Sequence, residues 1–132
     1  MRKKISSYEG LQSKIRQLKT PKIDVWRNQY HDKDYIITLE NTEFSCICPK
    51  TGLPDFAKIV IKYIPDKLCI ELKSFKMYML FYRDIGIFHE HVVNKILDDF
   101  VLACRPKYTS VAGEFNIRGG IKTLVNTDYK RA

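Results

Sequence analysis

The chain has 132 residues, of which 45% are hydrophobic, 12% are aromatic and 29% are charged. This length and composition are typical of one folded domain and exclude a largely disordered protein. The formal net charge of +8 indicates an anionic partner, and charge alone leaves nucleic acid, a membrane surface and a phosphorylated small molecule open.

The N-terminal residues and the spacing of the cysteines indicate the cellular compartment in which the protein is found. The first residues are basic but no apolar run follows them, so we expect no secretory signal, and no apolar run is long enough to span a bilayer. The four cysteines, Cys46, Cys48, Cys69 and Cys104, form neither a CxxC pair nor a zinc-finger spacing. We therefore expect a cytoplasmic protein with reduced thiols and no membrane partner.

The first third of the chain predicts an arm followed by one strand. Residues 1–22 are basic and weakly patterned, and we expect a partly ordered N-terminal arm there, with one domain over residues 23–132. Residues 24–28 predict a connector. Residues 35–40 are rich in β-branched side chains and predict a strand.

The remaining elements follow in the order strand, helix, helix, strand, strand. Residues 57–65 alternate apolar and polar side chains and predict a strand, and residues 68–72 predict a short extended piece. Apolar side chains at helical spacing predict the two helices, and alternation around a glycine turn predicts the final hairpin. These elements occupy residues 75–83, 89–104, 108–116 and 121–126. The order ββααββ predicts an α+β domain in which one antiparallel four-stranded sheet carries both helices on one face.

The loop between the first two predicted strands combines a cysteine, a turn rich in proline and glycine, and a carboxylate. Pro49, Gly52 and Pro54 restrict or license particular backbone angles, so they predict a loop of defined shape. Cys48 can act as a nucleophile once it is a thiolate, and Asp55 can fold back beside it as a proton donor or acceptor. An ordinary connection with a buried cysteine and a surface aspartate fits the same residues.

Positive charge gathers at the start of the first predicted helix. Lys73, Ser74 and Lys76 lie where free N–H groups and the positive end of the helix dipole favour an anion. Cations are unfavourable to the helix at that position, which favours a phosphate-bearing ligand, although a solvated basic face is the alternative. Ser74 is also the expected N-cap. Arg118, before two glycines, adds a cation for phosphate or for solvent.

The start of the second predicted helix carries His89, Glu90 and His91. The helix dipole favours Glu90 there, and an ionised carboxylate could also accept two hydrogen bonds from the N–H edge of a purine-like base. Two histidines together with Cys46 and Cys48 would suggest zinc. Residues two apart on a helix point to different sides, however, so we expect no metal.

Four phrases of the sequence together resemble the NADPH-dependent 7-cyano-7-deazaguanine reductases, the nitrile reductases of queuosine biosynthesis. In chain order they are residues 48–57 (CPKTGLPDFA), 71–78 (ELKSFKMY), 88–90 (FHE) and 118–121 (RGGI). The resemblance covers roughly residues 33–126, and the chain length resembles the short, single-module branch. Leu53 departs from the glutamine expected in that loop.

The resemblance implies a fold, an assembly and a chemistry. The fold is the tunnelling fold, in which small α+β units join their sheets into a ring-shaped barrel with active sites at subunit interfaces, here as a homo-oligomer of two stacked pentamers. Cys48 would attack the nitrile carbon to give a thioimide, Asp55 would move protons, and two NADPH would complete the reduction through a thiohemiaminal and an imine. The other implied site residues are Glu90 on the N–H edge of the 7-deazapurine, Ile70, Glu71, Leu72 and His89 around it, and Lys73, Ser74, Lys76 and Arg118 at the NADPH phosphates.

Three other functions are compatible with parts of the sequence. An amidinotransferase acting on 7-cyano-7-deazaguanine already placed in tRNA would keep the thioimide chemistry and would suit the positive charge. Residues 71–78 argue against it, because that branch resembles the reductases without this motif. A zinc-dependent cyclohydrolase of the same fold and a non-catalytic nucleic-acid-binding module are the others. The reductase resemblance implies no direct nucleic-acid partner.

Overall fold

The computed structural model describes residues 6–8 and 10–132. The predicted N-terminal arm therefore lies partly outside the described residues, at residues 1–5 and residue 9. In chain order the elements are β1 (Val25–Arg27), β2 (Ile37–Ile47), β3 (Pro54–Ile64), β4 (Leu68–Ile70), α1 (Leu72–Phe81), α2 (His89–Cys104), β5 (Tyr108–Arg118) and β6 (Ile121–Lys130), with 3₁₀ turns at Ile15–Gln17 and Tyr82–Asp84.

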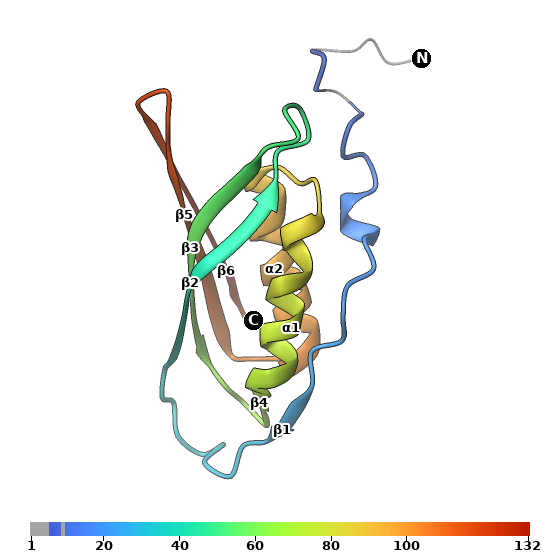
Figure 1. The fold of residues 1–132 in the computed structure, drawn as a ribbon. Helices are drawn as coiled ribbons and strands as arrows, with labels where there is room; N and C mark the ends of the chain where they lie inside the picture. Colours follow the sequence, from blue (N-terminus) through green and yellow to red (C-terminus); the bar gives the residue numbers. More distant parts are fainter. Residues whose placement is uncertain (1–5, 9) are drawn as a thin grey trace.

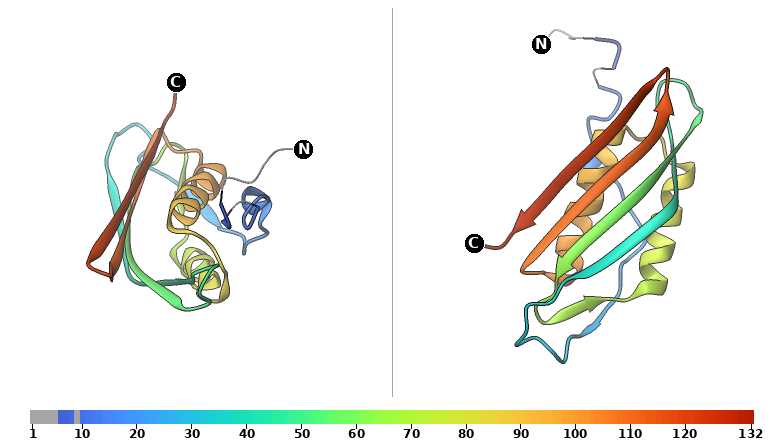
Figure 2. Two further views of the ribbon diagram at one scale, coloured as in Figure 1. Left: turned by 90° about the horizontal axis from the view of Figure 1, so that it is seen from above. Right: turned by 90° about the vertical axis from the view of Figure 1, so that its left-hand side faces the viewer.

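One antiparallel sheet forms the centre of the fold. Its strand order is β2-β3-β5-β6, and α1 and α2 both cover the same face of it (Figures 1 and 2). The α+β class and the four-stranded sheet with two helices on one face are thus confirmed. β2 and β6 are the edge strands, so each presents one row of backbone groups that no strand of this sheet pairs.

The core lies between the sheet and the helices because both contribute apolar faces. Strand β3 alternates strictly, with Ala57, Ile59, Ile61 and Tyr63 buried and their neighbours more exposed. Helix α2 supplies an apolar stripe to the same core, made of Val92, Val93, Ile96, Leu97 and Phe100. Burial of each such large side chain contributes about 1.5–3 kcal/mol. This packing fixes where the first residues of α2 stand relative to β3 and β5.

Three details differ from the sequence-based expectations. Helix α1 begins at Leu72 rather than residue 75, and its N-cap is Glu71 rather than Ser74. Residues 25–27 are not a connector but strand β1, which pairs antiparallel with β4 in a second, two-stranded sheet. Strands β2, β3, β5 and β6 are all longer than predicted, although β2 begins at Ile37 rather than residue 35 and β3 ends at Ile64 rather than residue 65. Helix α1 ends at Phe81 rather than residue 83, and helix α2 has the predicted bounds of 89–104.

The described part of the N-terminal segment packs beside the helices and away from the sheet (Figure 2). Ile15 and Leu18 are half-buried against the core, and Ile23 is fully part of it. Among the described residues, no helix is both long and apolar enough to cross a bilayer.

Candidate functional site

The loop that carries Cys48 is closed by backbone hydrogen bonds at its base. The N–H of Cys48 donates to the carbonyl of Leu53 at 2.9 Å, and the N–H of Gly52 donates to the carbonyl of Cys48 at 2.8 Å. Gly52 has a φ of 70°, a value at which a side chain is strained. The predicted loop of defined shape is therefore present, in a shorter form than expected because β2 and β3 extend into it.

The end of β2 is joined to the segment that precedes α2. Ile47 donates its N–H to the carbonyl of Ile85 at 2.9 Å and accepts from the N–H of Ile87 at 2.9 Å. These two bonds hold Cys48, the next residue, close to the start of α2. The sequence motifs around Cys48 and His89 are 41 residues apart, and this short parallel contact brings them together.

The thiol of Cys48 differs from the chain's other thiols. Hydrogen bonds from the Thr51 hydroxyl and from the Thr51 backbone hold the pKa of Cys48 below its ordinary value, and the thiol is only half-buried. Burial raises the pKa of Cys46 and of Cys104 to about 12, and Cys69 is also buried. Cys48 is thus the thiol best placed to react as a thiolate. Thr51 was not among the predicted residues.

Asp55 is a buried carboxylate held by two side chains. It pairs with Cys46 in the β2–β3 register, so both side chains point to the covered face of the sheet. His89 Nε2 lies 3.1 Å from Asp55 Oδ2, and Arg118 Nη2 lies 2.9 Å from Asp55 Oδ1. Because a carboxylate only accepts, this contact places a proton on Nε2 of His89. Arg118 also donates to the carbonyl of Pro54.

His89 is oriented by an aromatic ring as well as by Asp55. Its imidazole stacks on Phe115 with 3.8 Å between the ring centroids and 9° between the planes. Phe115 was not predicted as part of the site, because it reads in the sequence as one more inward-facing residue of β5. The stacked ring leaves His89 little rotational freedom, so Nε2 stays directed at Asp55.

Glu90 follows His89 at the first turn of α2 and is exposed. It lines a hollow of about 770 Å³ together with Phe88, His91 and residues of the N-terminal segment, among them Tyr8 and Gln12. An exposed carboxylate at a helix start, in a hollow with an aromatic ring, can accept hydrogen bonds from a flat N–H-bearing ligand.

The first N–H groups of α1 are bonded within the protein, whereas the sequence predicted that they would be free to bind an anion. The carboxylate of Glu71 accepts from the N–H of Lys73 at 2.7 Å and from the N–H of Ser74 at 2.8 Å, which holds the pKa of Glu71 below its ordinary value. These N–H groups were expected to be free for an anion. The Ser74 hydroxyl donates to the carbonyl of Glu71 and accepts from the N–H of Asp24.

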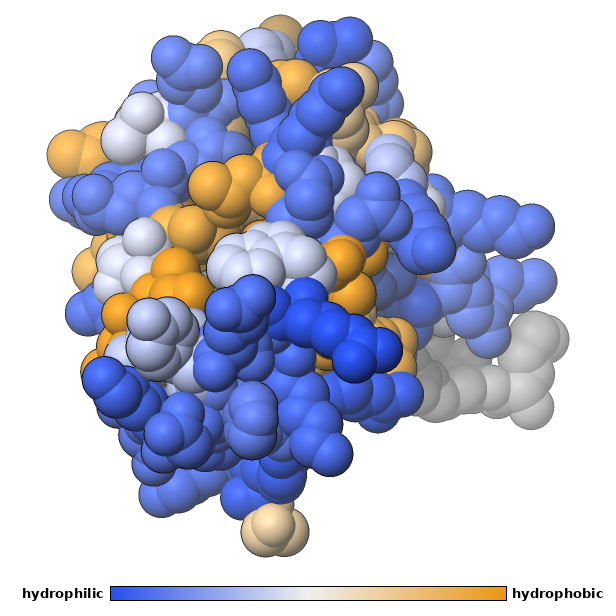
Figure 3. All heavy atoms as spheres, turned by 90° about the horizontal axis from the view of Figure 1, so that it is seen from below, coloured by the Kyte–Doolittle hydropathy of each residue, from blue (hydrophilic) through white to orange (hydrophobic). Residues whose placement is uncertain are grey.

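The other predicted residues of this motif divide into buried and exposed side chains. Ile70 is buried in β4, whereas Leu72, Lys73 and Lys76 are exposed. Seen from the end at which α1 begins, the surface is largely hydrophilic, with apolar patches between the polar side chains (Figure 3). Lys73 and Lys76 can therefore meet an anion without being buried.

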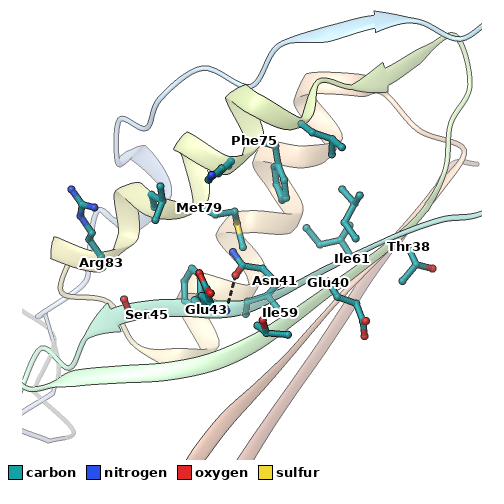
Figure 4. Close-up of a pocket in the computed structure, with 16 residues that line it drawn as sticks. Thr38, Glu40, Asn41, Glu43, Ser45, Ile59, Ile61, Phe75, Met79 and Arg83 are labelled. Atoms are coloured by element: carbon teal, nitrogen blue, oxygen red, sulfur yellow. Dashed lines mark hydrogen bonds between the residues drawn. The ribbon is translucent and has the colours of Figure 1, made fainter.

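A cavity of about 460 Å³ lies between α1 and the edge strand β2. Leu72, Lys76 and Arg83 of α1 line it, and Figure 4 shows Phe75 and Met79 directed toward the sheet, where Ile59 and Ile61 form its apolar floor. This cavity is separate from the Cys48 loop, which does not line it. The cavity therefore places an apolar surface next to the exposed side chain of Lys76.

The predicted site residues therefore form two groups in one chain. The first group lies where α1 ends and α2 begins, and it consists of Cys48, Asp55, His89, Glu90 and Arg118. The second group, the motif of residues 70–76, begins at the opposite end of α1 (Figure 1). A helix of the 10 residues in α1 is about 15 Å long. Within a single chain, residues 70–72 and the Cys48 group are therefore at opposite ends of α1. Among the residues that the structure describes, no three His, Cys, Asp or Glu side chains gather as metal ligands would.

Comparison with protein families gives a match over most of the folded part. The model of the family described as QueF-like protein matches residues 54–132. A relative from Elusimicrobium minutum, named NADPH-dependent 7-cyano-7-deazaguanine reductase, is 55% identical over 113 residues, which cover 86% of this chain and 85% of the relative. A relative of the same name from Chlorobaculum tepidum is 52% identical over 110 residues, covering 83% of this chain and 94% of the relative.

A solved structure shares the fold of this chain. The crystal structure of the archaeosine synthase QueF-Like in its apo form matches with a TM-score of 0.69 and 21% sequence identity, covering 76% of this chain and 98% of that one. At this identity the match shows the fold alone. It confirms the tunnelling fold.

Proposed function

Because this chain belongs to the family of the NADPH-dependent 7-cyano-7-deazaguanine reductases, we propose that it reduces the nitrile of its substrate through a covalent bond to Cys48. It is an oxidoreductase of queuosine biosynthesis that uses NADPH. One observation carries the assignment of the nucleophile. Cys48 is the half-buried thiol whose pKa is lowered by hydrogen bonds from Thr51, and its neighbour Ile47 is bonded to the segment that precedes α2.

The covalent step uses Cys48 and Asp55 together. The Asp55 carboxylate takes the proton of the Cys48 thiol and the resulting thiolate adds to the nitrile carbon. One C–N π bond becomes a lone pair on nitrogen, and the same proton passes from Asp55 to that nitrogen to give the thioimide. His89 and Arg118 hold the Asp55 carboxylate in place before the substrate arrives, at 3.1 Å and 2.9 Å. Two NADPH would supply two hydrides, which are the four electrons of the reduction, with the uptake of two protons. Between the two hydrides the C–S bond breaks and its electron pair returns to the sulfur of Cys48, so that the aminomethyl product is released and the thiol is restored.

Recognition of the 7-deazapurine is assigned to the first turn of α2. Glu90 presents its carboxylate to the hollow beside Phe88 and would accept from the N–H edge of the base. His89 contacts Asp55 and does not line this hollow, and we assign it to the substrate from its place next to Glu90 in the chain. The residues assigned to the substrate from the other end of α1 are Ile70, Glu71 and Leu72.

The NADPH phosphates are assigned to the cations near the start of α1. Lys73 and Lys76 fit this role because both are exposed and Lys76 borders the cavity under α1. Ser74 lies between them, with its hydroxyl bonded inside the protein. Arg118 is the further cation that we propose for the NADPH phosphates, and it lies beside Asp55 rather than near the start of α1.

We propose that two copies of the chain complete each active site, in a homo-oligomer of two stacked pentamers. The separation of the two groups of site residues along α1 supports this arrangement, because a neighbouring copy could bring its own residues 70–76 to the Cys48 group. The edge strands β2 and β6 offer the backbone groups through which sheets of adjacent copies could join. The proposal includes a cytoplasmic location, where the four thiols stay reduced, and no direct contact with nucleic acid.

Mass spectrometry of the intact protein tests the nucleophile. Incubation with 7-cyano-7-deazaguanine in the absence of NADPH should increase the mass of the wild-type chain by the mass of the nitrile. Cys48→Ala should remain folded and show no increase. Cys104→Ala, which alters a buried thiol at the end of α2 opposite His89, should still form the adduct. An adduct on Cys48→Ala would contradict the assignment.

A further inference from the structure

The N-terminal strap, by which we mean residues 6–8 and 10–13, contacts both the Cys48 loop and the start of α2. The proposed function leaves this segment without a role, and the sequence predicts for it only an arm. In the structure its side chains bond to both of the loops that carry the reacting and recognising groups. The strap therefore sits where it can influence the site.

Gln12 makes the central contacts of the strap. Its Oε1 accepts from the backbone N–H of Phe88 at 3.1 Å and lies 2.8 Å from Nδ1 of His91. Its Nε2 donates to the carbonyl of Gly86 at 2.9 Å. Because Phe88 donates, the atom that faces both partners is the amide oxygen, so Nδ1 of His91 carries a proton. One side chain thus binds three points of a six-residue turn.

The residues bound by Gln12 lie on either side of His89 and Glu90, the two residues proposed to contact the 7-deazapurine. Phe88 is the residue before α2, and the structure gives this helix no side-chain N-cap of its own. His89, which bonds to Asp55, and Glu90, which faces the hollow, lie between Phe88 and His91. Fixing both flanking residues fixes the direction in which His89 and Glu90 leave the backbone.

A second set of contacts joins the same strap to the nucleophile loop. Lys50, two residues after Cys48, donates from Nζ to the Ser7 hydroxyl at 2.9 Å and lies 5.0 Å from the ring centroid of Tyr8. The Tyr8 ring packs on Phe88 with 5.4 Å between centroids. The strap consequently holds the Cys48 loop and the first turn of α2 in one arrangement.

We propose that Gln12 is a positioning residue for the reduction, which orients the Phe88–His91 turn and so aligns Glu90 and His89 with the substrate. The inference rests on the proposed function, because it requires Glu90 to bind the 7-deazapurine. Gln12 acts through the turn and contacts neither Cys48 nor Asp55 in the described hydrogen bonds.

Steady-state kinetics of Gln12→Ala test this role. Removing bonds of about 1 kcal/mol net should raise KM for 7-cyano-7-deazaguanine roughly fivefold, with KM for NADPH unchanged. Gln12→Glu keeps an oxygen acceptor for Phe88 and His91 but places a carboxylate oxygen against the carbonyl of Gly86, so KM for the nitrile should rise less than in Gln12→Ala without matching the wild type. Gln17→Ala, an exposed glutamine further along the segment, is the matched control and should behave as wild type.

The outcomes separate the inference from the proposed function. If wild-type protein reduces the nitrile but neither Gln12 variant changes KM for it, or both KM values rise equally, the positioning role is wrong and the function stands. If wild-type protein does not reduce the nitrile at all, the proposed function fails and the inference fails with it. A purely structural role for Gln12 would lower stability without separating the two KM values.

Discussion

Gly113 of β5 lies directly under α2, where the structure leaves no room for a side chain. A methyl group there would stand 2.6 Å from Cγ2 of Val93 and 3.0 Å from Cε2 of Phe115. Carbon atoms in contact are normally about 3.5–4.0 Å apart, so one of these groups must move. Overpacking of this kind costs about 1–3 kcal/mol, and a stiffer unfolded chain offsets about 0.4–1 kcal/mol of that cost. Gly113→Ala should therefore lower the free energy of unfolding by roughly 1–2 kcal/mol.

Urea unfolding at a fixed protein concentration measures this loss. The midpoint should fall while the slope stays unchanged, because the native surface is nearly the same. Gly86→Ala is the matched control, since its methyl group would lie 3.9 Å from Cα of Pro49 and 4.0 Å from the carbonyl oxygen of Ile47, which is ordinary contact. Adding Val93→Ala to Gly113→Ala should cost less than the sum of the single changes. A Gly113→Ala protein as stable as the Gly86→Ala control would show that α2 leaves room for a methyl group at residue 113.

Two further predictions concern the proposed reaction. Thr51→Val removes the hydroxyl that lowers the pKa of Cys48, so that pKa should rise and the pH at which iodoacetamide alkylates Cys48 should move upward; Thr51→Ser keeps the hydroxyl and should not show the shift. Lys76→Ala should raise KM for NADPH more than KM for the nitrile, as steady-state kinetics would measure, whereas exposed Lys67→Ala should change neither. Equal rises in both KM values for Lys76→Ala would count against its phosphate role.

The sequence predicts the elements best where one chain segment determines them. Helix α2 has the predicted bounds because its apolar stripe is continuous and Pro106 follows it closely. Strand β1 is missed because three residues carry little periodicity, and its partner β4 lies more than 40 residues further on. The start of α1 is missed because a glutamate can cap a helix with its carboxylate, although serine is the commoner N-cap.

The composition of the site is more predictable than its geometry. The motifs identify Cys48, Asp55 and His89, but the contact between Asp55 and Arg118 depends on the strand register and on the irregular β5–β6 pairing before Arg118. Thr51, Phe115 and Gln12 are missed for a similar reason. Each acts through a partner that the fold brings near, and nothing in its own sequence neighbourhood distinguishes it from a loop, core or surface residue.

Reduction of the nitrile is tested by the stoichiometry of NADPH oxidation with 7-cyano-7-deazaguanine, with the product identified by mass. We expect about two NADPH to be consumed for each aminomethyl product, because each cofactor delivers one hydride to a four-electron reduction. Cys48→Ala should consume none above background. No oxidation together with an adduct on Cys48 would contradict reduction and leave only the thioimide chemistry, and the absence of both would contradict the whole account.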